Sequence, residues 1–173
     1  MSWLTSTELE RAVQWGAPTA HVRRTFHGVY PHNRLPVLLS KTACNETTTT
    51  LIVNTDSHNL PGRHWTSIYI DGVSGKGELF DPLVTPPSGH VMRFMNRHCR
   101  QWSRNRLIYQ HPLSSYCGVY VLLHVLHRHA YSSLVQFCEA NFTSSLLTNE
   151  QLIRNYYQRQ LLPRIIRQRR RKR

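Results

Sequence analysis

One cysteine stands in a setting that favours nucleophilic chemistry. Cys117 follows the loop HPLSSY and begins the apolar stretch CGVYVLLHVLHRHA, residues 117 to 130. If that stretch is a helix buried in the core, its N-terminal N–H groups and positive dipole end favour the thiolate form of the sulfur. Gly118 would leave room there for a substrate backbone. The alternative interpretation is a buried cysteine that serves only as a small hydrophobic residue.

A thiolate nucleophile needs a histidine with which it exchanges a proton. The chain contains 11 histidines, and His64 is the best placed of them. It opens an expected strand after the Gly-containing loop LPGR and precedes Trp65, and a residue at the end of a strand can reach a helix N-terminus. For any histidine taken alone, a solvated or core position is the simpler interpretation.

An aspartate partner for His64 follows from an expected β-hairpin. The runs HWTSIYID (64 to 71) and ELFDPL (78 to 83) flank the Gly-rich connector GVSGKG. Asp81, seventeen residues after His64, then lies on the partner strand within a residue or two of facing it. Its carboxylate could fix the imidazole tautomer and support the charged ring. Turn chemistry before Pro82 is the alternative, and the pairing register stays open.

A glutamine completes the set of candidate residues. Gln110 lies seven residues before Cys117, at the end of the expected strand RLIYQ (106 to 110). Acyl transfer builds negative charge on a carbonyl oxygen, which a side-chain amide and the Cys117 backbone N–H could stabilise together. By itself, a glutamine exposed on the surface is the simpler interpretation.

The elements that must position these residues follow an α+β pattern, with a small mixed or antiparallel sheet packed against helices. Thr7 and Glu10 have capping-box spacing, and Gly16 ends the first helix. Ser88 could cap a long basic helix that runs to about Arg104. The other expected elements are a short helix from 18, a structured loop at 26 to 36 leading into the apolar run 37 to 39, a strand at 50 to 54, and helices at 132 to 141 and 148 to 161.

The size and charge of the chain narrow the classes of protein to which it could belong. With 173 residues and 40% hydrophobic content, the chain suits a single domain with its own core. Its formal net charge of +13 indicates a polyanionic partner, with nucleic acid the first candidate. We expect the basic tail 163 to 173 to be disordered and to serve in nuclear import or phosphate binding, a solvating role being the alternative. Its last five residues are Arg169, Arg170, Arg171, Lys172 and Arg173.

Cysteine usage and hydropathy indicate a soluble intracellular protein. The four cysteines are widely separated and form no CxxC pair, which predicts a reducing compartment (Cys44, Cys99, Cys117 and Cys138). No apolar run approaches the roughly 20 residues of a membrane span. The stretch MSWLTSTELE lacks the regions of a signal peptide.

Taken together, HW at 64 and 65, LFDP at 79 to 82, Gln110 and YCGVY at 116 to 120 resemble the adenain and Ulp superfamily of cysteine proteases. That family orders its site as His, Asp or Glu, Gln, Cys. FHGVYPHNRLP and LIVNTDSHNLPGRHW also resemble adenain-type proteases of large DNA viruses and of Maverick or Polinton transposons.

The resemblance implies one papain-like or Ulp-like domain over residues 1 to 162, with the nucleophile at the N-terminus of a buried central helix. It implies His64 as the general base, Asp81 as its orienting partner, Gln110 in the oxyanion hole and Cys117 as the nucleophile. Supporting contacts with the substrate would come from Trp65 and Gly118.

The resemblance further implies a monomeric endopeptidase, without a metal, that cleaves precursor virion proteins in the virion and the host nucleus, in association with DNA. Cys99 lies where adenovirus protease carries the cysteine that joins an activating peptide by a disulfide, so an activating peptide is an expected cofactor. An ordinary cysteine is the alternative. The chain departs from the mammalian-virus pattern in having Asp81 where Glu is usual, as the Ulp enzymes do. It also has Val121 and Leu122 where further cysteines follow the nucleophile in that pattern.

Three other interpretations stay open. The same site would serve a protease that removes ubiquitin-like modifiers. A packaging protein that binds DNA without catalysis would use the arginines spaced along the basic helix. These are Arg93, Arg97, Arg100, Arg104 and Arg106. A zinc site at His124 and His127 is the weakest of the three interpretations, because no Cys/His cluster with zinc-ligand spacing accompanies these two residues.

Overall fold

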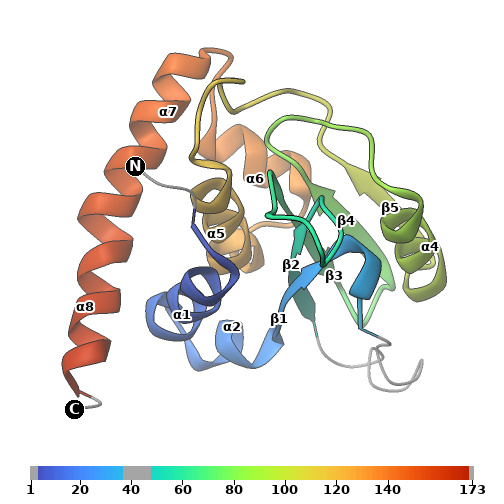
Figure 1. Ribbon diagram of the computed structural model, residues 1–173, viewed down its shortest axis with the longest axis horizontal. Helices are drawn as coiled ribbons and strands as arrows, with labels where there is room; N and C mark the ends of the chain where they lie inside the picture. Colours follow the sequence, from blue (N-terminus) through green and yellow to red (C-terminus); the bar gives the residue numbers. More distant parts are fainter. Residues whose placement is uncertain (1–3, 37–47, 172–173) are drawn as a thin grey trace.

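A mixed five-stranded sheet lies at the centre of the chain in a computed structural model that describes residues 4–36 and 48–171 (Figure 1). The three central strands run antiparallel to one another, and each outer strand is parallel to its neighbour. The expected α+β class with a small mixed sheet is therefore confirmed. In spatial order the strands are β1 (Phe26–Pro31), β2 (Thr49–Asn54), β3 (Trp65–Ile70), β4 (Lys76–Phe80) and β5 (Gln101–Arg104).

The β3–β4 hairpin has the arrangement that the sequence predicts, and the structure supplies its register. Ser67 faces Phe80. One step further along, Asp81 comes opposite Thr66, two residues from His64. The connecting turn contains Gly75 at a φ of +69°, a left-handed conformation that glycine adopts without strain.

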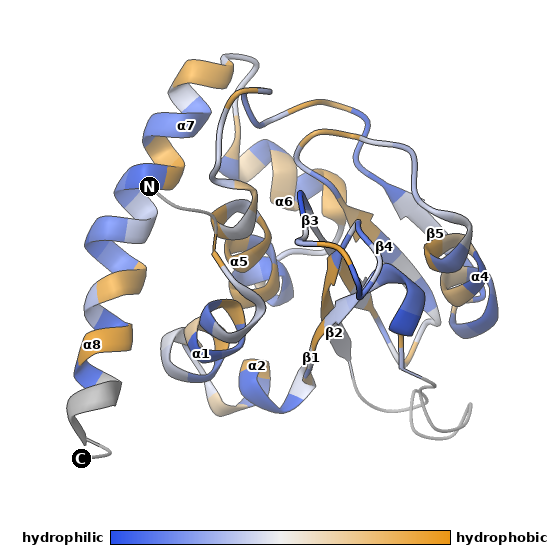
Figure 2. Ribbon diagram, viewed as in Figure 1, coloured by the Kyte–Doolittle hydropathy of each residue, from blue (hydrophilic) through white to orange (hydrophobic). Residues whose placement is uncertain are grey.

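Helix α5 (Cys117–His127) is the buried central helix that the apolar stretch predicts. All ten residues from Cys117 to Leu126 are buried, as expected for a helix that is hydrophobic on every side (Figure 2). It packs between the sheet and α1 (Ser6–Gly16). Residues from both faces of the helix join one core cluster, including Leu9, Ile52, Phe80, Val121, Val125 and Phe137.

Two polar contacts fix α5 to the sheet. The His124 ring is fully buried, stacks on Phe80 with 5.0 Å between ring centroids, and shares a 2.9 Å hydrogen bond with the hydroxyl of Ser67 on β3. Burial holds the pKa of His124 well below its usual value, so the ring is neutral. Just beyond the helix, Arg128 Nη2 donates to Glu78 Oε1 on β4 at 2.7 Å. These contacts set the position of Cys117 relative to the hairpin.

Helix α4 (Gly89–His98) covers the opposite face of the sheet. Alternation along the strands produces the two faces, since Ile52 points into the α5 cluster while Leu51 and Val53 point toward α4. The cluster on the α4 face consists of Leu51, Val53, Ile68, Ile70, Leu79, Val91, Phe94 and Met95. Both faces of the sheet are therefore buried.

The last part of the chain forms a continuous helical rod beside α1 (Figure 1). It consists of α7 (Leu146–Asn155), the π-helical turn η3 (Tyr156–Leu161) and α8 (Leu162–Arg171). The disorder expected for 163 to 173 is therefore wrong for residues 163 to 171, because Leu161 is buried and Ile165 packs against the core. Arg169, Arg170 and Arg171 belong to α8, while Lys172 and Arg173 lie outside the described residues.

Gly16 explains how closely the rod approaches α1. A Cβ at this position would collide with the end of the Leu161 side chain, so the glycine lets Leu161 pack directly on α1. The described residues also include the helices α2 (Ala20–Thr25) and α6 (Leu134–Asn141). No helix in the parts of the chain that the structure describes is long and apolar enough to cross a lipid bilayer.

Two expectations near the start of the chain are corrected. The capping box of α1 is formed by Thr5 and Glu8, not by Thr7 and Glu10, with a 2.8 Å hydrogen bond from the Thr5 backbone N–H to the Glu8 carboxylate. The segment expected as a loop at 26 to 36 contains β1, because it pairs in parallel with β2, followed by the short 3-10 helix η1 (His32–Arg34). The apolar run 37 to 39 lies outside the described residues.

The expected long basic helix is also corrected. It ends at His98, because residues 101 to 104 pair with β4 as strand β5. Residues 106 to 110 form no strand and instead connect β5 to α5. Of the five arginines expected on one helix, only Arg93 and Arg97 lie on α4. Arg100 follows the helix, Arg104 lies on β5 and donates to the Val84 carbonyl at 2.8 Å, and Arg106 lies in the connection.

Candidate active site

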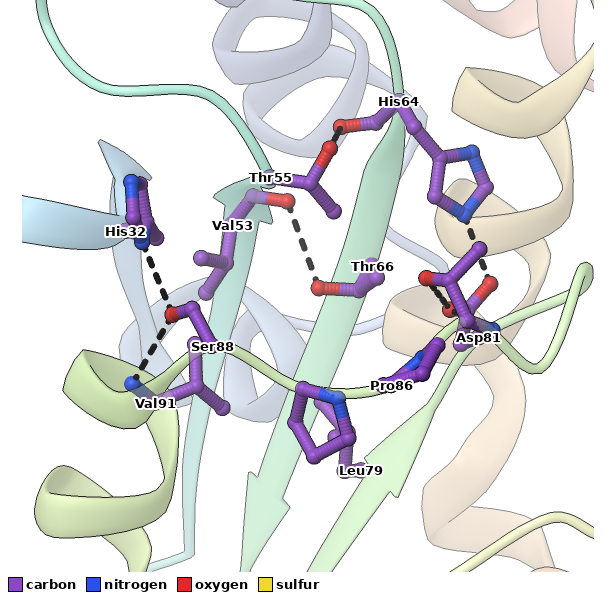
Figure 3. Close-up of a pocket in the computed structure, with 12 residues that line it drawn as sticks. His32, Val53, Thr55, His64, Thr66, Leu79, Asp81, Pro86, Ser88 and Val91 are labelled. Carbon is purple, nitrogen blue, oxygen red and sulfur yellow. Dashed lines mark hydrogen bonds and ion pairs between the residues drawn. The ribbon is translucent and has the colours of Figure 1, made fainter.

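The end of the hairpin brings His64 and Asp81 together. His64 Nε2 donates a 2.6 Å hydrogen bond to Asp81 Oδ1, and both side chains are buried (Figure 3). His64 immediately precedes β3 and Asp81 immediately follows β4, so the register of one hairpin places the two groups. The pairing that the seventeen-residue spacing predicts is therefore present.

The Asp81 carboxylate is held from several sides. It accepts hydrogen bonds from the backbone N–H groups of Leu83 and Thr85, each at 2.8 Å, and from the Thr85 hydroxyl at 2.5 Å. Burial acts to raise the pKa of Asp81, but the bond from His64 and the bonds from Thr85 and Leu83 outweigh it and keep that pKa below its usual value. The carboxylate is therefore charged at neutral pH.

The backbone around Asp81 is fixed by two further features. The Asn105 amide donates to the Asp81 carbonyl at 2.7 Å and accepts from the Asp81 N–H at 2.9 Å. Val84, inside the turn that wraps the carboxylate, has a φ of +56°, which is strained for a β-branched residue. Such strain persists only where the surroundings impose it, and here it allows both N–H groups to reach the carboxylate.

Cys117 lies close enough to the His64 ring to raise the pKa of the imidazole. Nε2 donates to Asp81, while Nδ1 is buried and has no hydrogen-bond partner among the described residues. Burial alone would lower the pKa of His64, but the bond to Asp81 and the neighbouring Cys117 outweigh it and raise that pKa to about 9. The imidazole is therefore positively charged at neutral pH.

Cys117 is the first residue of α5 and is fully buried. The preceding residue, Tyr116, provides no side-chain cap for the helix. The N-cap side chain therefore does not block the first N–H groups of α5, which can interact with negative charge that develops beside the sulfur.

Gln110 is buried, which excludes the simpler interpretation of an exposed glutamine. Its Nε2 group donates to the Ser114 carbonyl at 2.9 Å, three residues before Cys117. One amide hydrogen is used in this way and an amide has two. Oε1 is buried without a hydrogen-bond partner among the described residues. The amide is therefore held against the loop that leads to the sulfur, with hydrogen-bonding capacity left over.

A cavity of about 240 Å³ opens beside the His64–Asp81 pair (Figure 3). Its walls include apolar side chains of the sheet and of α4, such as Val53, Leu79 and Val91. On the far wall, the hydroxyl of Ser88, which caps α4, lies 2.8 Å from His32 Nδ1. The cavity lies on the α4 side of the sheet, away from α5.

Trp65 and Gly118 contact the chain's own N-terminal segment. The Trp65 indole donates to the Leu4 carbonyl at 3.0 Å, and a Cβ on Gly118 would lie 3.2 Å from the Leu4 side chain. The space expected for a substrate at Gly118 is thus bounded by Leu4. A second cavity, of about 310 Å³, borders this contact and is lined by Leu4, Leu60, Pro61, Gly62 and Trp65 among others.

The remaining expected site residues lie apart from the cluster. Cys99 follows α4 and is half-buried, with its sulfur against Gly77 on β4. His124 bonds to Ser67, whereas the His127 ring lies 3.0 Å from the Tyr156 hydroxyl. Within residues 4–36 and 48–171, no group of three or more metal-ligating side chains comes together.

Several residues that hold the site carry no signal in the sequence. Thr85 and Asn105 look like ordinary loop residues, and Glu150 like one of several polar residues at the start of a helix. Asn105 and Glu150 act through contacts with segments more than twenty residues away, whereas Thr85 contacts Asp81 within one turn. The Asp-Pro pair at 81 and 82 could have indicated the tight turn around Thr85.

The chain matches no family model and no curated protein. Two crystal structures of the pS273R protease of African swine fever virus (ASFV) superpose on it with TM-scores of 0.65 and 0.64, at 20% identity. They cover 92% of this chain and 67% and 68% of theirs. A structure of the SUMO protease Ulp1, with its catalytic cysteine oxidized to a sulfinic acid, has a TM-score of 0.46 at 14% identity, covering 94% of this chain and 79% of its own. The ASFV similarity shows that this chain has the fold of the pS273R protease, as the expected protease fold requires.

Proposed function

We propose that this chain is a cysteine endopeptidase. The observation that carries the proposal is the meeting of three elements in a protease fold: a buried, charged His64–Asp81 pair, a cysteine at a helix N-terminus, and a buried glutamine amide beside it. A fold alone hosts many functions, so the proposal rests on this arrangement of side chains.

In the proposed reaction, the sulfur of Cys117 attacks the carbonyl carbon of a peptide bond and forms a tetrahedral intermediate. The Gln110 amide and the N–H groups at the start of α5 stabilise the oxygen that becomes negative. His64 then gives its proton to the departing amine, which leaves an acyl-enzyme. A water molecule that transfers a proton to His64 hydrolyses this thioester and restores the cysteine. Asp81 keeps the ring oriented throughout and supports its positive charge whenever the ring is protonated.

The test is digestion of a proteome-derived peptide library with the wild-type protein and with Cys117→Ala. We expect cleavage by the wild type and none by the variant. Cys138→Ala is the matched control, because Cys138 lies on α6 and burial raises its pKa to about 11, so it is a poor nucleophile. Equal peptide patterns from the wild type and Cys117→Ala would contradict the proposal.

The finer part of the proposal concerns the substrate. The resemblance to adenain-type proteases supports precursor virion proteins as substrates, with action in the virion and the host nucleus. Removal of ubiquitin-like modifiers is the competing activity, because the same residues could perform both. A panel of modifier adducts beside virion precursor proteins would distinguish them. Cleavage of the adducts alone would favour the second activity.

We also propose an interaction with DNA. The formal net charge is +13, and Arg93, Arg97 and Arg106 are exposed. Each phosphate contact should contribute about one unit to the slope of log affinity against log salt. Replacing these three arginines with Gln should lower that slope, and binding that does not respond to salt would contradict the proposal.

An activating peptide joined through Cys99 stays a prediction from the resemblance. Its test is mass spectrometry of the virion-derived protein under non-reducing conditions, compared with the same sample after reduction. A peptide-sized mass lost on reduction from the Cys99 tryptic fragment would support it, and an unmodified fragment in both samples would contradict it.

A further inference from the structure

The segment from 110 to 116 joins Gln110 to Cys117 and contains neither helix nor strand. Its shape therefore depends on individual hydrogen bonds. Ser114 is the centre of them, because its carbonyl accepts from Gln110 Nε2 at 2.9 Å and its hydroxyl accepts from the Tyr116 N–H at 3.1 Å. Ser114 thus contacts both the glutamine amide and the residue that precedes the cysteine.

Glu150, on the distant helix α7, holds this segment from outside. Its Oε2 atom accepts from the Ser114 hydroxyl at 2.6 Å, and its Oε1 atom accepts from the His111 N–H at 3.2 Å. The Tyr120 hydroxyl on α5 is also within 3.2 Å of Oε1. One half-buried carboxylate thus connects α7, α5 and the segment between Gln110 and Cys117. Hydrogen bonds to an ionised group are shorter and stronger than neutral ones.

The neighbouring residue fixes the other side of Gln110. Asn149 is fully buried, and its amide donates to the Tyr109 carbonyl at 3.1 Å. The Tyr109 and Gln110 N–H groups both donate to the Pro82 carbonyl, at 2.9 and 3.1 Å. Gln110 therefore stands between residues bound by Asn149 and Glu150, and its backbone is attached to the residue after Asp81.

We infer that Glu150 is a positioning residue for the oxyanion-stabilising amide of Gln110, acting through Ser114. This inference rests on the proposed function. Glu150 itself does not contact the sulfur or the imidazole in any of its hydrogen bonds. Its effect on the reaction comes from orienting an amide whose placement must be accurate, because a displacement of about 1 Å can cost on the order of 100-fold in rate.

The first experiment compares Glu150→Ala and Glu150→Gln with the wild type on a peptide substrate. We expect Glu150→Ala to lower kcat by about 10- to 100-fold with little change in KM, because the lost positioning matters in the transition state. Glu150→Gln keeps an oxygen that can accept from the His111 N–H, so it should lower kcat less than Glu150→Ala does. Glu139→Ala is the matched control, since Glu139 is an exposed carboxylate on α6.

The second readout separates positioning from general damage. Alkylation of Cys117 by iodoacetamide needs the sulfur and His64 but no oxyanion hole. We therefore expect its rate in Glu150→Ala to stay within about 3-fold of wild type, since only the oxyanion-stabilising groups are disturbed. A parallel loss of alkylation and turnover would show that the variant disrupts the whole site and would overturn the inference.

A double-mutant cycle with Gln110→Ala supplies the decisive comparison. If Glu150 acts through Gln110, adding Glu150→Ala to Gln110→Ala should lower kcat by no more than about 3-fold. Full additivity of the two losses, or an unchanged kcat in Glu150→Ala alone, would overturn the inference. A wild-type protein that cleaves no peptide would instead contradict the proposed function.

Discussion

The two halves of the candidate site differ in how completely their polar groups are bonded. On the sheet side, the Asp81 carboxylate receives hydrogen bonds from His64, Leu83 and Thr85, so its charge is held in place before any substrate arrives. On the α5 side, Gln110 makes one side-chain hydrogen bond, and its Oε1 atom has no partner among the described residues. The Asp81 carboxylate is fully bonded, whereas the Gln110 amide keeps hydrogen-bonding capacity in reserve.

This difference fits the chemistry proposed for each half. The positive charge that His64 carries before a substrate binds requires a partner already in place, because a buried charge without one is costly. The negative charge on a substrate oxygen exists only during the reaction, so its donors must be oriented and yet available. The sheet half is built on the regular pairing of β3 and β4, whereas the other half depends on an irregular segment tied to α7.

The largest effect should come from breaking the sheet half. Asp81→Asn keeps the size of the side chain but removes the charge that supports His64, so kcat/KM should fall by about 10³- to 10⁴-fold. Asp71→Asn, in the turn of the same hairpin, is the control and should change kcat/KM little. Steady-state kinetics with circular dichroism of both variants would check this. A loss below about 10-fold in folded Asp81→Asn would contradict the role of the pair.

Removal of the glutamine amide tests the other half. Gln110→Ala should lower kcat by about 10²- to 10³-fold, the usual cost of one oxyanion donor. The rate of Cys117 alkylation should change far less, because the His64–Asp81 pair is untouched. Single-turnover kinetics beside an iodoacetamide time course would measure both quantities. Unchanged turnover would remove Gln110 from the oxyanion hole.

Alkaline pH should weaken the sheet half without any mutation. The pKa of His64 in the folded protein is about 9, above its ordinary 6.5, so the proton on His64 stabilises the fold. This contribution is complete below about pH 6.5 and is lost as the pH rises through about 9. Urea unfolding from pH 7 to 10 should therefore show a steeper loss of stability in the wild type than in Asp81→Asn. Parallel curves for the two proteins would show that His64 carries no such proton.

The smallest effect concerns the strained turn around the carboxylate. Val84→Gly removes a left-handed strain of about 1–2 kcal/mol but adds about 0.5–1 kcal/mol of unfolded-state entropy. We expect the free energy of unfolding to rise by less than about 1 kcal/mol, measured by urea denaturation. Val73→Gly is the control, because Val73 is an exposed turn residue without a positive φ, and it should not raise the free energy of unfolding. A clear destabilisation in Val84→Gly would mean that the valine side chain contributes more than its strain costs.

Corrections to the expected elements cluster where distant segments meet. Residues 101 to 104 stand at the end of the expected basic helix, yet they pair with β4 as the edge strand of the sheet. Residues 163 to 171 look like a solvated tail by charge, yet Leu161 and Ile165 give the rod an apolar contact with the core. Charge and local periodicity are properties of one segment, whereas the conformation of these segments depends on contacts with distant parts of the chain.

Local patterns in the amino-acid sequence predict two features of the site: the hairpin whose spacing pairs His64 with Asp81, and the apolar helix that begins at Cys117. These follow from short-range periodicity and turn chemistry, which act within some twenty residues. The bonds by which Asn105 fixes the Asp81 backbone, and those by which Asn149 and Glu150 secure the segment around Gln110, are visible only in the folded chain. Those contacts join residues 24 to 40 positions apart, and no local pattern records which polar side chain will meet which buried backbone group.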